Sequence, residues 1–299
     1  MRGILKQVWY AVRPLTAQQR FLWWCGTLML ASGAAHTVVA VVDWAPWWGA
    51  VSWRKPAVFG MSFGILSWSA VWIMRQLPVR RWGWLPAVLL GAGSVVEIIA
   101  VTMQRWRGEA SHFNYGSSFD EAVWSTMGNV VLLVALALTV FLVWSLVRFE
   151  GSPAARIAVV VGLLAMEVSG YIGFGMADKG EKAVEATGQV PETVKFGAEG
   201  SAKLAHAVGM HGLQLLGLLA IGLAIGSVAR RTQIKIMVLA AAGYAAVFGG
   251  VAATAYAGRA WTSPTAAMAA LIAAGALAVM VAAAATVTRL SPARADVVK

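Results

Sequence analysis

The sequence has few charged residues and a single cysteine. Only 12% of its 299 residues are charged, and Cys25 stands alone, so an intrachain disulfide and a CxxC redox pair are both excluded. Neither an HExxH nor an HxxxH pattern occurs, which removes the usual motifs of membrane metallohydrolases. Acidic residues are also scarce, with 13 Asp and Glu against 24 Lys and Arg. The chain consists instead of hydrophobic residues, which make up 59% of it and give a mean hydropathy of +0.70.

Apolar runs of about 20 residues recur along the whole chain, and each is long enough to cross a bilayer as a helix. We therefore expect an all-α polytopic membrane bundle. Its eight helices are predicted at residues 17–43, 56–76, 83–104, 119–147, 154–177, 202–229, 233–258 and 264–288.

The expected helices form a single transmembrane domain over residues 1–299. The helices within 17–229 form its core, and the Ala/Gly-rich helices within 233–288 form a flank. Gly60 and Gly64 predict a face for close helix packing. The loop 178–200 mixes Lys and Glu, which predicts a solvated lid or a short surface helix.

Basic residues lie mostly between the expected helices. Fifteen of the 24 Lys and Arg residues fall on the side of both termini, so the positive-inside rule places both termini in the cytoplasm of a cell with an inner membrane. The formal net charge of +11 then reflects topology and contact with acidic lipid headgroups. We expect the lipid bilayer, and no nucleic acid, as a partner.

Five of the expected helices each carry one polar side chain at a similar depth. With a rise of 1.5 Å per residue, His36 and Glu97 lie about 10 Å below one end of their helices, and Asn129, Glu167 and His211 about 15 Å. Polar side chains inside membrane helices usually face the bundle interior and mark a site. The sequence therefore predicts a polar layer within the bundle.

Two histidines and two carboxylates from four helices are typical of metal sites in helical bundles. We predict a divalent metal site with the ligands His36, Glu97, Glu167 and His211. A haem is the other candidate cofactor, with axial ligands drawn from His36, His206 and His211. The same layer is also compatible with a proton-coupled transporter, or with an accessory subunit in which these groups only hold the helices together.

A second polar group is predicted at the outer mouth of the bundle. Several cations there suit a small anionic substrate, and a lipid-soluble substrate is the alternative. His112 and His206 are the predicted acid/base residues. The predicted substrate-binding residues are Arg54, Lys55, Gln104, Arg105, Arg107, Asn114, Asn129 and Gln214.

Two segments carry a resemblance to known sequences. QRWRGEASHFN at 104–114 and LAHAVGMHGLQ at 204–214 are similar to segments of uncharacterised bacterial multi-pass membrane proteins. The resemblance covers about a tenth of the chain. That group has no established activity, so the resemblance implies only the membrane fold and emphasises His112, His206 and His211.

Overall fold

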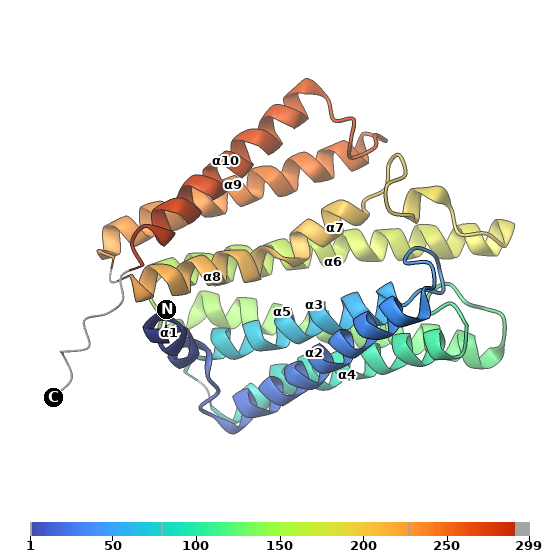
Figure 1. Ribbon diagram of the computed structural model, residues 1–299, viewed down its shortest axis with the longest axis horizontal. Helices are drawn as coiled ribbons and strands as arrows, with labels where there is room; N and C mark the ends of the chain where they lie inside the picture. The colour runs from blue at the N-terminus through green and yellow to red at the C-terminus, as the bar shows by residue number, and fades with distance from the viewer. Residues whose placement is uncertain (1, 79, 227, 291–299) are drawn as a thin grey trace. The chain divides into compact units, whose positions relative to one another are not determined.

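Figure 1 shows the computed structural model, which describes residues 2–78, 80–226 and 228–290. The C-terminal residues 291–299, which were counted on the predicted cytoplasmic side, lie outside this range. The described residues form helices joined by loops and turns, without any β-strand. The helices are α1 (Arg2–Val12), α2 (Ala17–Asp43), α3 (Arg54–Met74), α4 (Trp84–Trp106), α5 (Ser118–Val147), α6 (Pro153–Thr187), α7 (Lys203–Met210), α8 (Gly212–Ile225), α9 (Arg230–Tyr256) and α10 (Ala266–Val287), with short 3₁₀ helices at Arg81–Gly83 and Glu192–Val194.

The described part of the chain contains eight helical segments that are long and apolar enough to cross a membrane. Two of these segments are composite, because α4 is preceded by a 3₁₀ turn and α7 continues into α8. The all-α class and the multi-pass character expected from the sequence are confirmed at this level. All eight expected helices are present, with ends that differ by a few residues in most cases.

Three features differ from the expected helices. Residues 2–12 form the additional helix α1, which is amphipathic and too short to be counted as a span. Helix α6 extends ten residues into the predicted loop 178–200, since Lys182 pairs with Asp178 at 2.9 Å and Gly188 ends the helix at a φ of 70°. The expected helix 202–229 is interrupted at His211.

The chain divides into two compact units, with a boundary inside α5. The N-terminal unit comprises residues 14–141, and the C-terminal unit comprises residues 142–290 together with 2–13. This division differs from the expected boundary between core and flanking helices, which stays a prediction.

In the N-terminal unit, glycines hold α2 and α3 close together. A Cβ added to Gly60 would lie 2.8 Å from the Cα of Gly33, and one added to Gly64 would lie 2.9 Å from the carbonyl oxygen of Gly26. Real Cβ atoms do not approach other atoms so closely, so larger residues would force the two backbones apart. The close packing predicted for Gly60 and Gly64 is confirmed.

In the C-terminal unit, α6 packs against α7, α8 and α9, and α9 forms an antiparallel pair with α10. Figure 1 shows this pair in orange and red. The pair is closest where Gly243 faces Gly275, since a Cβ on either would lie 2.5 to 2.7 Å from the other's carbonyl oxygen. The small side chains of these helices thus permit tight backbone contact, as the sequence predicted.

Candidate functional site

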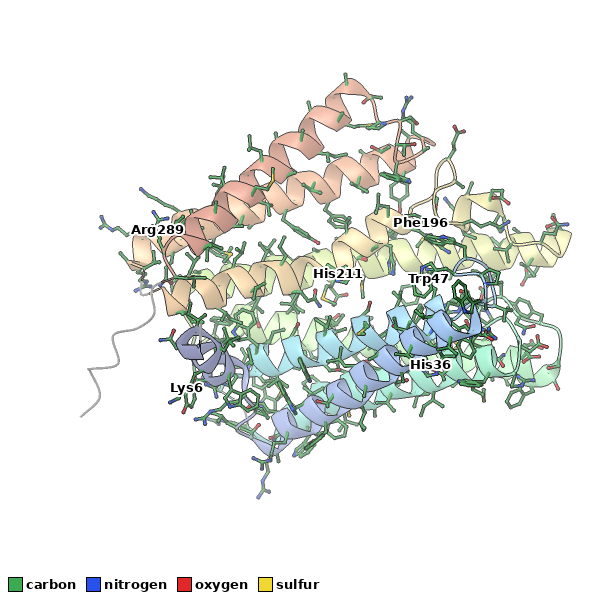
Figure 2. All side chains as sticks on the ribbon, viewed as in Figure 1. Lys6, His36, Trp47, Phe196, His211 and Arg289 are labelled. Carbon is green, nitrogen blue, oxygen red and sulfur yellow. The ribbon has the colours of Figure 1, made fainter. Side chains whose placement is uncertain are left out.

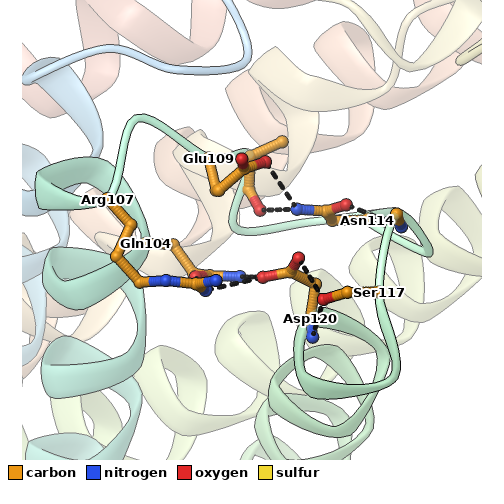
Figure 3. A network of polar contacts seen from close by, with 8 residues as sticks. Gln104, Arg107, Glu109, Asn114, Ser117 and Asp120 are labelled. Atoms are coloured by element: carbon orange, nitrogen blue, oxygen red, sulfur yellow. Dashed lines mark hydrogen bonds and ion pairs between the residues drawn. The ribbon is translucent and has the colours of Figure 1, made fainter.

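A polar network in the N-terminal unit joins the end of α4 to the start of α5 (Figure 3). Asp120 lies at its centre and is only 4% exposed. Its carboxylate accepts hydrogen bonds from the Gln104 amide at 2.8 Å, from the Arg107 guanidinium at 2.6 Å and from the Ser117 hydroxyl at 2.6 Å. Arg107 also donates to the amide oxygen of Gln104. Gln104 and Arg107, both predicted to bind substrate, thus donate their hydrogen bonds to a carboxylate of the protein.

The loop after α4 is stabilised by Asn114. Its side-chain nitrogen donates to the carbonyl oxygen of Ala110 at 3.1 Å and to the Glu109 carboxylate at 3.4 Å, and its oxygen accepts from the backbone N–H of Gly116 at 3.0 Å. Figure 3 shows the side chain of Asn114 within this loop. These are contacts of a turn-forming asparagine. Asn114, predicted to bind substrate, has a local structural role in this geometry.

A second cluster at the same end of this unit surrounds Asp43, the last residue of α2. The Asp43 carboxylate accepts a hydrogen bond from the Trp53 indole at 2.5 Å and pairs with Arg105 at 3.3 Å. The guanidinium of Arg105 lies 3.9 Å from the centre of the Trp53 ring, a cation–π contact. Arg54 stacks in the same way on Trp48 at 5.0 Å. Aromatic rings and one carboxylate therefore surround these predicted anion-binding cations.

His36 is integrated into the same cluster. Its Nδ1–H donates to the carbonyl oxygen of Ser32 at 2.7 Å, and its Nε2 accepts from the Trp106 indole N–H at 3.1 Å. Both ring nitrogens are therefore occupied, as in a neutral imidazole. A metal ion or haem iron would need the Nε2 lone pair that Trp106 uses, so this arrangement does not favour the predicted ligand role of His36.

Lys55, Ser111 and His112 form a hydrogen-bonded chain. The Lys55 ammonium donates to the Ser111 hydroxyl at 3.1 Å, and the Ser111 oxygen lies 2.9 Å from Nδ1 of His112. The His112 ring packs against Phe59 and Trp124, with centroid distances of 5.8 and 5.1 Å. Ser111 is 3% exposed and Lys55 and His112 are half-buried, and this chain joins the start of α3 to the loop after α4.

In the C-terminal unit, the interruption of the helix at His211 depends on Tyr244 from α9. At the break the backbone N–H of His211 donates to the carbonyl oxygen of Val208 at 3.1 Å, and the Tyr244 hydroxyl donates to the carbonyl oxygens of Val208 and Gly209 at 2.6 and 3.3 Å. A Cβ on Gly212 would lie 2.7 Å from the Tyr244 ring. The sequence VGMHG therefore supplies both the interruption and the space for the tyrosine that stabilises it.

His206 lies one turn before the break and holds α7 against α6. Its Nδ1–H donates to the carbonyl oxygen of Ser169 at 2.7 Å, and the Ser169 hydroxyl donates to the carbonyl oxygen of His206 at 2.6 Å. The imidazole covers Gly173, where a Cβ would lie 2.9 Å from the ring. These reciprocal bonds favour a role in helix packing over the predicted acid/base role.

An open groove of about 570 Å³ lies beside the break and is lined by residues of α7, α8, α9 and α10 and by His211. Its wall is almost wholly apolar and consists of Leu204, Ala207, Val208, His211, Leu215, Tyr244, Val247, Ala276, Val279 and Met280. Tyr244 uses its hydroxyl in the bonds described above. His211 is exposed, and its ring nitrogens have no hydrogen-bond partner among the described residues. Figure 2 shows it at the junction of α7 and α8.

The remaining predicted substrate-binding residues and metal ligands lie outside the polar clusters described above. The Gln214 amide nitrogen donates to the main-chain oxygens of Met210 and His211 at 3.0 and 3.2 Å, so it bonds to the backbone at the break between α7 and α8. Asn129 is exposed on α5, whereas Glu97 is 2% exposed within the N-terminal unit. Glu167 is half-buried on α6.

The predicted metal ligands are divided between the two units. His36 and Glu97 belong to the N-terminal unit, and Glu167 and His211 to the C-terminal unit. Over the described ranges, no three His, Cys, Asp or Glu side chains are grouped in a way that suits a metal ion.

Comparison of the chain with protein-family models, curated proteins and solved structures finds no match.

Proposed function

We propose that the chain is a multi-pass inner-membrane protein that binds a lipid-soluble molecule in the groove beside His211. One observation carries the proposal: an imidazole without a hydrogen-bond partner among the described residues lies in the wall of an apolar groove in a candidate span. This keeps one of the substrate classes expected from the sequence. The metal ion, the haem and the proton pathway stay predictions.

The position of His211 along the helix supports a ligand within the membrane. Eight residues separate it from Lys203 at the start of the segment, which corresponds to a depth of about 12 Å. At such a depth the imidazole lacks water as a partner, and an unsatisfied polar group is unfavourable. A ligand that brings a hydroxyl or carbonyl group to His211 would satisfy it.

The lining and size of the groove specify the remainder of the ligand. Its walls are mostly aliphatic and small side chains of α7, α8, α9 and α10, which suit a hydrocarbon chain or an apolar ring. A volume of about 570 Å³ lies within the range of about 300–1,000 Å³ typical of small-molecule sites. The proposed ligand class is therefore an amphiphile with one hydrogen-bonding group on an apolar body.

The test uses a long-chain alcohol that carries a photoreactive diazirine, added to the full-length protein in phosphatidylcholine nanodiscs. Cross-links identified by mass spectrometry should fall on α8, α9 and α10 around the groove. Leu215→Trp fills the groove and should abolish this labelling. Leu218→Trp is the matched control, because Leu218 lies one turn further along α8, is 66% exposed and does not line the groove.

His211→Leu tests recognition of the polar group. Loss of one hydrogen bond of about 1 kcal/mol should weaken capture of the alcohol about fivefold. Capture of the matching alkane diazirine should not change. If Leu215→Trp and Leu218→Trp are labelled equally, or if His211→Leu affects both probes alike, ordinary lipid fills the groove and the proposal is wrong.

A further inference from the structure

Helix α1 has two distinct faces. Ile4, Gln7, Val8, Ala11 and Val12 are half-buried, and the helix packs against α8. The opposite face exposes Leu5, Lys6, Trp9 and Tyr10, with 64%, 47% and 44% of the surfaces of Leu5, Trp9 and Tyr10 accessible. With 11 residues the helix is about 16 Å long, too short to cross a bilayer.

The exposed face combines cations with interfacial aromatics. The Lys6 ammonium and the Arg13 guanidinium lie 5.9 and 4.5 Å from the centre of the Tyr10 ring. No acidic residue occurs before Asp43. Tryptophan and tyrosine prefer the headgroup level of a membrane, and lysine and arginine favour anionic headgroups. This face is therefore complementary to an anionic membrane surface.

The neighbouring helix ends extend the positive charge. Helix α1 lies beside α8 at the end where α8 and α10 finish and α9 begins (Figure 1). The ends of α8 and α10 are in close contact there, because a Cβ on Gly226 would lie 2.6 Å from the carbonyl oxygen of Arg289. Lys6 and Arg289 appear at this end in Figure 2. The end of α5 and the start of α6 lie at this end of the unit as well (Figure 1). The cations that the sequence places at these helix ends are Arg148, Arg156, Arg230, Arg231, Lys235 and Arg289, with Glu150 as the acid among them.

The opposite end of the same unit is balanced. There the end of α6, the following loop and the turn after α9 carry equal numbers of acids and cations. The acids are Asp178, Glu181, Glu185, Glu192 and Glu199, and the cations are Lys179, Lys182, Lys195, Lys203 and Arg259. The positive charge of the C-terminal unit is thus concentrated at the end that carries α1.

We propose that α1 and these helix ends form a binding surface for the anionic phospholipids of one leaflet. In this arrangement α1 lies in the headgroup region, with Leu5, Trp9 and Tyr10 in the interface and Lys6 beside the phosphates. The half-buried face keeps α1 on α8, and the charge anchors the end of the C-terminal unit to that leaflet. This surface is separate from the groove and does not depend on the proposed ligand.

The test places an environment-sensitive NBD fluorophore on α1 of the full-length protein. Leu5→Cys is introduced in a Cys25→Ser background, and the labelled protein is reconstituted in nanodiscs of phosphatidylcholine with or without 30% phosphatidylglycerol. Emission should be blue-shifted and quenched by a headgroup nitroxide lipid, and quenching should rise at least twofold with phosphatidylglycerol. Lys6→Glu should abolish that rise.

Thr187→Cys, at the balanced end of the same unit, is the matched control. A label there should show no dependence on phosphatidylglycerol, and a label at Leu277→Cys on α10 should confirm insertion of each variant. The proposal is overturned if the label at position 5 emits as in water. It is also overturned if its quenching is independent of phosphatidylglycerol or unchanged by Lys6→Glu.

Discussion

At the scale of single residues, ionisable side chains near the ends of the candidate spans bind one another within a unit. Arg105 and Arg107 each pair with a carboxylate, Asp43 and Asp120 respectively. His36 uses both ring nitrogens. His211 differs from these residues, because its ring has no hydrogen-bond partner within the described residues and it lines the groove. The contrast identifies His211 as a groove-lining residue with hydrogen-bonding capacity left for a ligand.

Asp120 should be the most sensitive residue of the polar network in Figure 3. Replacement by alanine leaves Gln104 and Arg107 without their acceptor and should destabilise the N-terminal unit by about 2–3 kcal/mol. Cys25, the single cysteine, lies in this unit and is partly buried, so a thiol-reactive dye reports its thermal unfolding. Glu121→Ala, one residue on and exposed, should change stability by less than about 0.5 kcal/mol. Equal effects of the two variants would contradict this assignment.

At the scale of helices, glycine positions decide how closely the elements approach. On α2 and α3, Gly33 and Gly60 face each other with no space for a side chain. Around the break between α7 and α8, Gly209 and Gly212 give Phe248 and Tyr244 of α9 access to the backbone. The break is therefore held by tertiary contacts, and the groove beside it shares the same tyrosine.

Gly60→Ala should separate α2 from α3 and lower the stability of the N-terminal unit by about 1–3 kcal/mol, because overpacking strains a close contact. Gly128→Ala, on α5 of the same unit, adds a methyl group into open space. It should leave stability unchanged or raise it by up to about 1 kcal/mol through helix propensity. Thermal unfolding followed through Cys25 compares the two variants, and a neutral Gly60→Ala would show that the contact is not tight.

At the scale of the whole molecule, the two compact units contain different kinds of polar site. The N-terminal unit has networks in which polar side chains of its own helix ends bind one another. The C-terminal unit has the groove and the charge asymmetry between its two ends. Ligand binding and attachment to an anionic leaflet are therefore both proposed for the C-terminal unit.

The same asymmetry leads to a prediction about topology. The positive-inside rule places the α1 end of the C-terminal unit in the cytoplasm and the loop after α6 outside. In a Cys25→Ser background expressed in intact bacterial cells, Gln189→Cys should react with a membrane-impermeant maleimide. Arg231→Cys should react only after the cells are opened. The reverse pattern of labelling would show the opposite orientation.

The all-α class and the eight candidate spans were predictable from the sequence, whereas the contacts of the candidate site were not. Backbone groups in lipid must bond within their own segment, so each long apolar run specifies a helix whatever its neighbours are. The positions of Glu97 and Gln104 on α4 followed from the same patterns, whereas the break at His211 did not. Tertiary structure alone decided that the Trp106 indole donates to Nε2 of His36 and that Asp120 accepts from both Gln104 and Arg107. It also decided that Tyr244 stabilises a break at His211. Those partners are 13 to 70 residues apart, and helix rotation and packing, which a local pattern does not encode, bring them together.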